Sequence, residues 1–124
     1  MLRINRSEFE DLVREALEGL PQEFWDRIEN VDVVVADRPS REQLIENGLG
    51  PGETLFGLYQ GIPLTHRQGY GFVAPDKITI FQRPLEDHCD TQEELVEQVR
   101  STVVHEVAHY FGISDEWLDE HGLD

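Results

Sequence analysis

Two histidines and a glutamate near the C-terminus have the types and the spacing of a metal-dependent hydrolytic site. His105 and His109 are four residues apart, so on a helix they share one face, with about 6 Å between their Cβ atoms. Two imidazoles at this separation can bind one Zn²⁺. Glu106 is rotated by about 100° around the helix from His105, so its carboxylate can reach a water molecule on the metal. The sequence therefore predicts a zinc site at which Glu106 acts as general base.

A third protein ligand has to come from elsewhere, because two histidines leave zinc under-coordinated. Gly112 can adopt a positive φ and let the chain turn sharply off the helix. Asp115, three residues later, could then return its carboxylate to the metal and complete a catalytic geometry with one open position. Alternatively, Asp115 is the N-cap of a short terminal helix, and Glu116 is then the next-best ligand. Glu120 or His121 would reach the metal only if that helix folded back over the site.

The motif lies on a predicted helix that begins after Thr91. Thr91 and Glu94 have the spacing of a capping box, and the helix is expected to end at Gly112. Its length is then about 20 residues, or about 30 Å. A helix this long in a small domain usually packs on a sheet. Its apolar side is expected to carry Leu95, Val96, Val99, Val103, Val107 and Phe111.

Two further helices and several strands are expected upstream. An amphipathic helix is predicted over residues 9–20, beginning at a capping box of Ser7 and Glu10, and a short helix over residues 40–47. β-branched and alternating residues predict strands, some with glycines that suggest bulges or a close backbone approach. These strands cover residues 31–36, 54–59, 69–73 and 77–81. The order of elements favours an α+β fold.

The composition indicates a small acidic domain. With 124 residues the chain is expected to form one domain, 1–124, and its net charge of −16 disfavours nucleic acid and membrane surfaces as partners. Cys89 is the single cysteine, which excludes a disulfide framework and fits a reducing compartment. We interpret Cys89 as a bystander, with a redox-sensitive thiol or a stray metal ligand as alternatives. A cytoplasmic location is expected, because no signal peptide or membrane-length apolar run is recognisable.

Three segments carry a resemblance to a known family. The string HEVAHYFGISD over residues 105–115 is similar to the HExxHxxGxxD variant of the zincin metallopeptidases, in which the third ligand is aspartate. More narrowly, the chain resembles the small bacterial zincin-like metallopeptidase family. In that family a glycine-rich segment, here residues 55–67, and a Pro-Asp-x-Ile-Thr strand, here residues 75–79, precede the motif helix.

This resemblance implies a minimal zincin-like fold, in which a small mixed sheet packs on the long C-terminal helix and on the N-terminal helix. It also implies zinc on His105, His109 and Asp115, Glu106 as general base, and a peptide or protein segment as substrate. The chain departs from larger zincins in having no methionine after the motif. Groups that stabilise the oxyanion must therefore come from upstream. Candidates by residue type are Tyr59, Tyr70 and the pair His66 and Arg67, a pair that we interpret first as loop residues.

Three functional hypotheses follow. The first is a zinc-dependent peptidase whose substrate lies extended along an edge strand from residues 55–73. The missing methionine turn and lower sub-domain motivate the second, a non-catalytic binding or regulatory module in which the metal stabilises the fold. The third is a metal-dependent ribonuclease, against which Glu106, Asp115 and the net charge of −16 argue.

Overall fold

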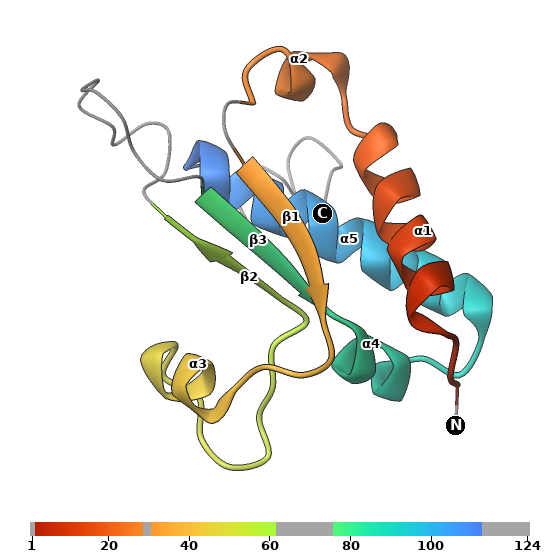
Figure 1. The fold of residues 1–124 in the computed structure, drawn as a ribbon, viewed down its shortest axis with the longest axis vertical. Helices are drawn as coiled ribbons and strands as arrows, with labels where there is room; N and C mark the ends of the chain where they lie inside the picture. The colour runs from red at the N-terminus through yellow and green to blue at the C-terminus, as the bar shows by residue number, and fades with distance from the viewer. Residues whose placement is uncertain (1, 29–30, 62–75, 113–124) are drawn as a thin grey trace.

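The computed structural model describes residues 2–28, 31–61 and 76–112 (Figure 1). Within these ranges there are three strands, with helices before, between and after them, and the first of the two last helices follows directly on the last strand. The elements are α1 (Arg6–Glu18), α2 (Gln22–Trp25), β1 (Val31–Ala36), α3 (Arg41–Glu46), β2 (Gly57–Gln60), β3 (Asp76–Phe81), α4 (Gln82–His88) and α5 (Gln92–Phe111). None of the described helices is long and apolar enough to cross a bilayer.

The three strands form a mixed sheet in the order β1-β3-β2. β1 runs parallel to β3, and β2 runs antiparallel to β3, so that Ile78 is the register partner of Val33 on one side and Tyr59 on the other. The alternating sequence of β3 predicts a half-buried strand, but five of its six residues are buried because β3 is the central strand. The expected α+β fold with a small mixed sheet is confirmed.

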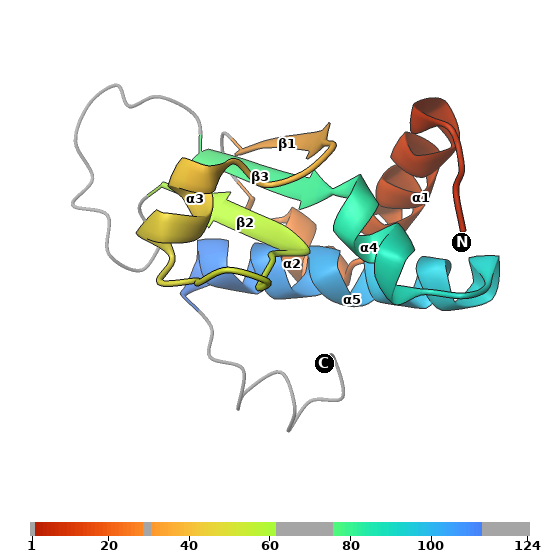
Figure 2. The same ribbon diagram turned by 90° about the horizontal axis from the view of Figure 1, so that it is seen from below.

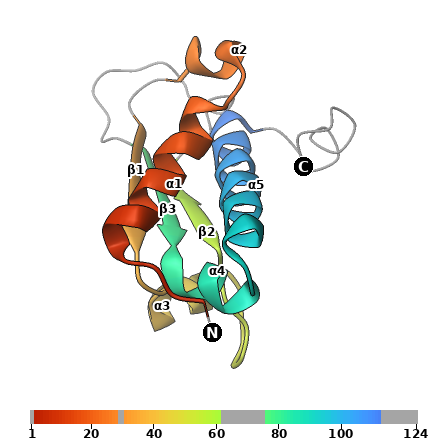
Figure 3. The same ribbon diagram turned by 90° about the vertical axis from the view of Figure 1, so that its right-hand side faces the viewer.

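Helix α5 lies across one face of this sheet and contacts both β2 and β3 (Figure 2). Helix α1 packs against α5, as Figure 3 shows, and lies beside the β1 edge. The core forms where these elements meet, and its members are almost entirely excluded from water. They include Phe9 and Val13 of α1, Ile78 and Ile80 of β3, and Val99, Val103 and Val107 of α5. Packing against both the sheet and α1 therefore fixes the position of α5.

Both ends of α5 are defined by the residues that the sequence predicts. Thr91 is the N-cap, and its hydroxyl oxygen accepts a hydrogen bond from the Glu94 backbone N–H at 3.1 Å. At the other end Gly112 has φ 71°, a left-handed conformation that favours glycine. Its N–H donates to the carbonyls of Ala108 and His109, which closes the last turn. The helix of 20 residues agrees with the predicted length.

Other boundaries differ from the prediction. Helix α1 begins at Arg6, because Asn5 and not Ser7 is its N-cap: the Asn5 side-chain oxygen accepts from the Glu8 backbone N–H at 2.8 Å. Asparagine and serine are equally good N-caps, so composition alone does not choose between them. Strand β2 begins at Gly57 rather than at residue 54. The expected strand over residues 69–73 and the expected terminal helix lie outside the described residues.

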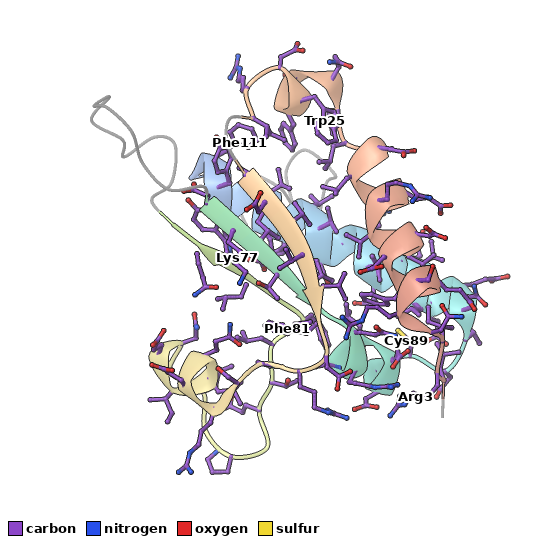
Figure 4. The ribbon with its side chains drawn as sticks, in the orientation of Figure 1. Arg3, Trp25, Lys77, Phe81, Cys89 and Phe111 are labelled. Atoms are coloured by element: carbon purple, nitrogen blue, oxygen red, sulfur yellow. The ribbon has the colours of Figure 1, made fainter. Side chains whose placement is uncertain are left out.

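The sequence patterns do not predict the short helices α2 and α4. Helix α4 follows β3 without a loop, and Pro84 sits in its first turn, where no intrahelical N–H is needed. Glu86 of α4 is completely buried and accepts hydrogen bonds from the Ile4 backbone N–H at 3.0 Å and from Arg83 at 2.9 Å. This carboxylate ties the N-terminal segment to α4, at the end of the molecule where Figure 4 labels Arg3 and Cys89.

Candidate active site

The last turns of α5 bring the two predicted metal ligands together. The ring centroids of His105 and His109 are 5.9 Å apart, and their planes are nearly perpendicular at 86°. His105 is half-buried, whereas the His109 side chain is 46% exposed. Both imidazoles therefore lie on one face of the helix, on a side that solvent reaches. This geometry follows from their spacing of four residues.

Glu106 lies between this pair and the sheet. It is buried, and its side chain keeps only 10% of its accessible surface. One carboxylate oxygen, Oε1, is 3.3 Å from Nδ1 of His109. If Nδ1 carries the proton, it donates to this carboxylate, and the lone pair of His109 is on Nε2, the nitrogen that can then coordinate a metal. The contact thus orients both side chains.

Strand β2 approaches α5 closely at Gly57. A Cβ atom at this position would be 2.8 Å from Cγ2 of Thr102 and 2.9 Å from Cγ of Glu106, closer than real Cβ atoms come to their neighbours. Only glycine therefore lets the strand pass at this distance. The sequence predicts a close approach somewhere in this glycine-containing strand, but it does not show that Glu106 is the partner.

A groove opens beside the motif. It has a volume of about 320 Å³ and lies between residues 54–57 and the N-terminal side of the motif on α5. Figure 2 shows the chain that leads into β2 running alongside this helix. The side chains that α5 contributes are Gln98, Ser101, Thr102, His105 and Glu106. No pattern in the sequence predicts this groove, because the segment before β2 has no regular structure.

The predicted third ligand, Asp115, lies outside the described residues, as do Glu116, Glu120 and His121. Among residues 2–28, 31–61 and 76–112, no three side chains of the metal-binding types are grouped so that they could hold a metal ion. The described part of the site therefore provides two imidazoles. Borderline nitrogen donors of this kind fit zinc, and a third ligand has to come from the rest of the chain.

Of the candidates for stabilising the oxyanion, only one lies within the described residues. His66, Arg67 and Tyr70 lie outside the described residues. Tyr59 lies on β2, but its hydroxyl donates to the Asp76 carboxylate at 2.7 Å, and its ring stands edge-on to the Tyr110 ring, with 6.2 Å between the centroids. These contacts give Tyr59 a place in the packing between β2 and α5.

Cys89 is far from the motif. It is buried in the turn before α5, and from the start of α5 to His105 is about 20 Å at 1.5 Å per residue. Desolvation, with smaller contributions from Glu94 and Asp90, raises the pKa of its thiol. A thiol with these properties is a weak nucleophile.

The comparison with known families decides the assignment. The family described as Zincin-like metallopeptidase matches residues 28–123, most of the chain and all of the motif. The chain belongs to the zincin-like metallopeptidases. This confirms the resemblance that the sequence motifs indicate, and it implies peptide substrates and zinc as properties of the family.

Comparison with solved structures supports the fold of this zincin-like chain. A conserved hypothetical protein from Thermo thermophilus is similar to it with a TM-score of 0.55 and 20% sequence identity. The alignment covers 97% of this chain and 100% of the other. No curated protein is significantly similar to the chain in sequence.

Proposed function

We propose that this protein is a zinc-dependent metallopeptidase in which Glu106 is the general base. The observation that carries the proposal is the position of Glu106: its carboxylate is largely buried, is held against β2 at Gly57, and lies 3.3 Å from a ring nitrogen of His109. A carboxylate fixed next to two neighbouring imidazoles suits the transfer of a proton beside a metal ion.

His105 and His109 would hold the metal, and Asp115, proposed from the sequence motif, would be the third ligand. When bound, zinc supplies a Lewis acid that polarises the scissile carbonyl and makes a water molecule more acidic. Gly112 supports this role of Asp115, because its left-handed conformation ends the helix and turns the chain three residues before Asp115.

Glu106 moves the proton. Its carboxylate accepts a proton from the attacking water as the water oxygen bonds to the carbonyl carbon. The same carboxyl group then gives that proton to the amide nitrogen as the C–N bond breaks, so the products are a carboxylic acid and an amine. Burial and the contact with His109 keep the carboxylate in one orientation through both transfers.

The substrate is proposed to lie extended along β2. In the described part of the chain, β2 pairs only with β3 and is therefore an edge strand. Its outward-facing backbone groups can hydrogen bond to an added strand. Because β2 contacts α5 next to Glu106, a peptide paired with this edge passes beside the two histidines.

Metal content of the purified protein tests the ligand set. The wild-type protein is expected to retain about one equivalent of zinc, whereas His105→Ala, His109→Ala and Asp115→Ala lose most of it, because each removes one of three protein ligands. His88→Ala, an exposed histidine on α4, is the matched control and should retain the wild-type amount. Full zinc retention in His109→Ala would reject the site.

Cleavage of a peptide library tests the chemistry. The wild-type protein should cleave members that Glu106→Gln does not, with zinc retained in both, because glutamine cannot accept the proton. Glu97→Gln, an exposed carboxylate on the same helix, should cleave like the wild type. Equal rates for wild type and Glu106→Gln would reject Glu106 as base. Zinc binding without any cleavage would favour the non-catalytic binding module.

A further inference from the structure

We propose that the groove between residues 54–57 and α5 receives the substrate side chain on the C-terminal side of the scissile bond, and that it selects an uncharged amide side chain, asparagine or glutamine. This inference rests on the proposed peptidase function and adds the class of substrate. It depends on where the groove lies relative to His105 and Glu106 and on which groups line it.

The groove begins at the motif itself. His105 and Glu106 form one end of its lining, and Gln98, two turns earlier on α5, forms the other. A side chain in the groove therefore belongs to a residue next to the bond that Glu106 would act on. The groove has a volume of about 320 Å³, which is enough for one side chain.

The direction of the peptide follows from the direction of β2. Gly57 lies against Thr102 and Glu106, and Tyr59 lies against Tyr110, so β2 and α5 run in the same direction along the site. A peptide that pairs antiparallel with β2, the slightly more stable arrangement, runs the opposite way. Its C-terminal part then reaches residues 54–57, and so it is a residue after the scissile bond that faces the groove.

Hydrogen-bonding groups in the groove match an amide. The Thr102 hydroxyl donates to the Gln98 carbonyl at 2.7 Å, within the helix. By contrast, the Ser101 hydroxyl and the Gln98 carboxamide have no hydrogen-bond partner among residues 2–28, 31–61 and 76–112, and both are half-buried. Each can donate and accept. A carboxamide side chain also does both, whereas a purely apolar one displaces water from these half-buried groups and offers no hydrogen bond in return.

Charge in the groove disfavours acidic side chains. The lining contains no lysine or arginine, and its one acidic group is the Glu106 carboxylate. An aspartate or glutamate there would face that carboxylate in a protein with net charge −16, without a lysine or arginine in the groove to pair with. Leu55 and Phe56 cover the opposite wall and can pack on the methylene groups of the bound residue.

Matched peptides test this selection. The residue after the scissile bond of one constant decapeptide is varied among glutamine, glutamate and leucine, and binding to zinc-loaded Glu106→Gln protein is measured by fluorescence anisotropy. The glutamine peptide is expected to bind about tenfold more tightly than the glutamate peptide, and also more tightly than the leucine peptide. Combining Gln98→Ala and Ser101→Ala in that background should remove most of the preference for glutamine over leucine. Gln92→Ala, which replaces an exposed glutamine of α5, should preserve it.

Cleavage by the wild-type protein, with the same peptides, separates the two proposals. Cleavage of all three at similar rates, or a preference unchanged by the double substitution, would overturn the groove assignment and leave the peptidase function standing. Selective binding without cleavage would support the groove and overturn the catalytic proposal. Absence of both binding and cleavage for every peptide would overturn both.

Discussion

Replacing Gly57 by alanine is the most direct test of the contact between β2 and the candidate catalytic helix. The added Cβ would sit 2.8 Å from Thr102 Cγ2 and 2.9 Å from Glu106 Cγ. Carbon atoms in good contact are about 3.5–4.0 Å apart, so each contact is too short by roughly 0.6–1.2 Å. Both partners lie on α5, which is held by the core on its other side and cannot move away without loss of packing.

Overpacking of this kind costs about 1–3 kcal/mol. At about 4 °C per kcal/mol for a domain of this size, the melting temperature of Gly57→Ala should fall by about 4–12 °C in a thermal scan. If the strain also displaces the Glu106 carboxylate, kcat should fall by about 10–100-fold at a temperature where both proteins are folded.

Two controls separate the clash from other effects of the substitution. Gly19→Ala places its Cβ no closer than 3.6 Å to any neighbour, so its stability should stay within about 1 kcal/mol of wild type. Thr102→Ser in the Gly57→Ala background removes Cγ2 and should recover part of the stability, relative to Thr102→Ser alone. A melting temperature of Gly57→Ala equal to that of the wild type would show that the close approach does not exist.

Three further outcomes follow from the end of the molecule that carries α4. Glu86→Leu leaves the partly buried Ile4 backbone N–H and Arg83 guanidinium without their acceptor, and urea unfolding should show a loss of about 1–2 kcal/mol, whereas a change of less than about 0.5 kcal/mol would contradict the network. Hydrogen bonding from Arg3, followed by Arg38, holds the pKa of Asp87 below its usual 3.8. Asp87→Asn should therefore be less stable than wild type above that pH, and the difference should vanish as the pH falls through the lower folded-state pKa, as pH-dependent melting would show. Because burial raises the pKa of Cys89, its native-state reaction with a disulfide reagent should be far slower than that of an unfolded chain, and equal rates would refute its burial.

The sequence predicts the elements whose signals are local. The cap at Thr91, the left-handed Gly112 and the apolar repeat between them define α5, so the placement of His105 and His109 on one face could be derived from spacing alone. β-branched runs likewise predict β1 and β3. These patterns are reliable because each depends on residues within a few positions of one another.

What the sequence does not predict depends on contacts between distant segments. No local pattern shows that Gly57 packs on Glu106, 49 residues later in the chain. Nor does one show that the Tyr59 hydroxyl donates a hydrogen bond to Asp76. Helix α4 is missed because it follows β3 without a turn and is anchored by Glu86 to the N-terminal segment. The third metal ligand remains a proposal, because Asp115 lies outside the described residues.

Two sides of α5 have different roles. One side is packed among apolar side chains of α1 and β3 along the length of the helix, while the other carries the paired imidazoles near its C-terminal end. The core of the described residues is thus formed by apolar side chains, unlike a zinc finger, whose chain is unfolded until it binds metal. Removing the metal with a chelator should therefore abolish the proposed activity while the chain stays folded, and the protein should bind zinc again without refolding.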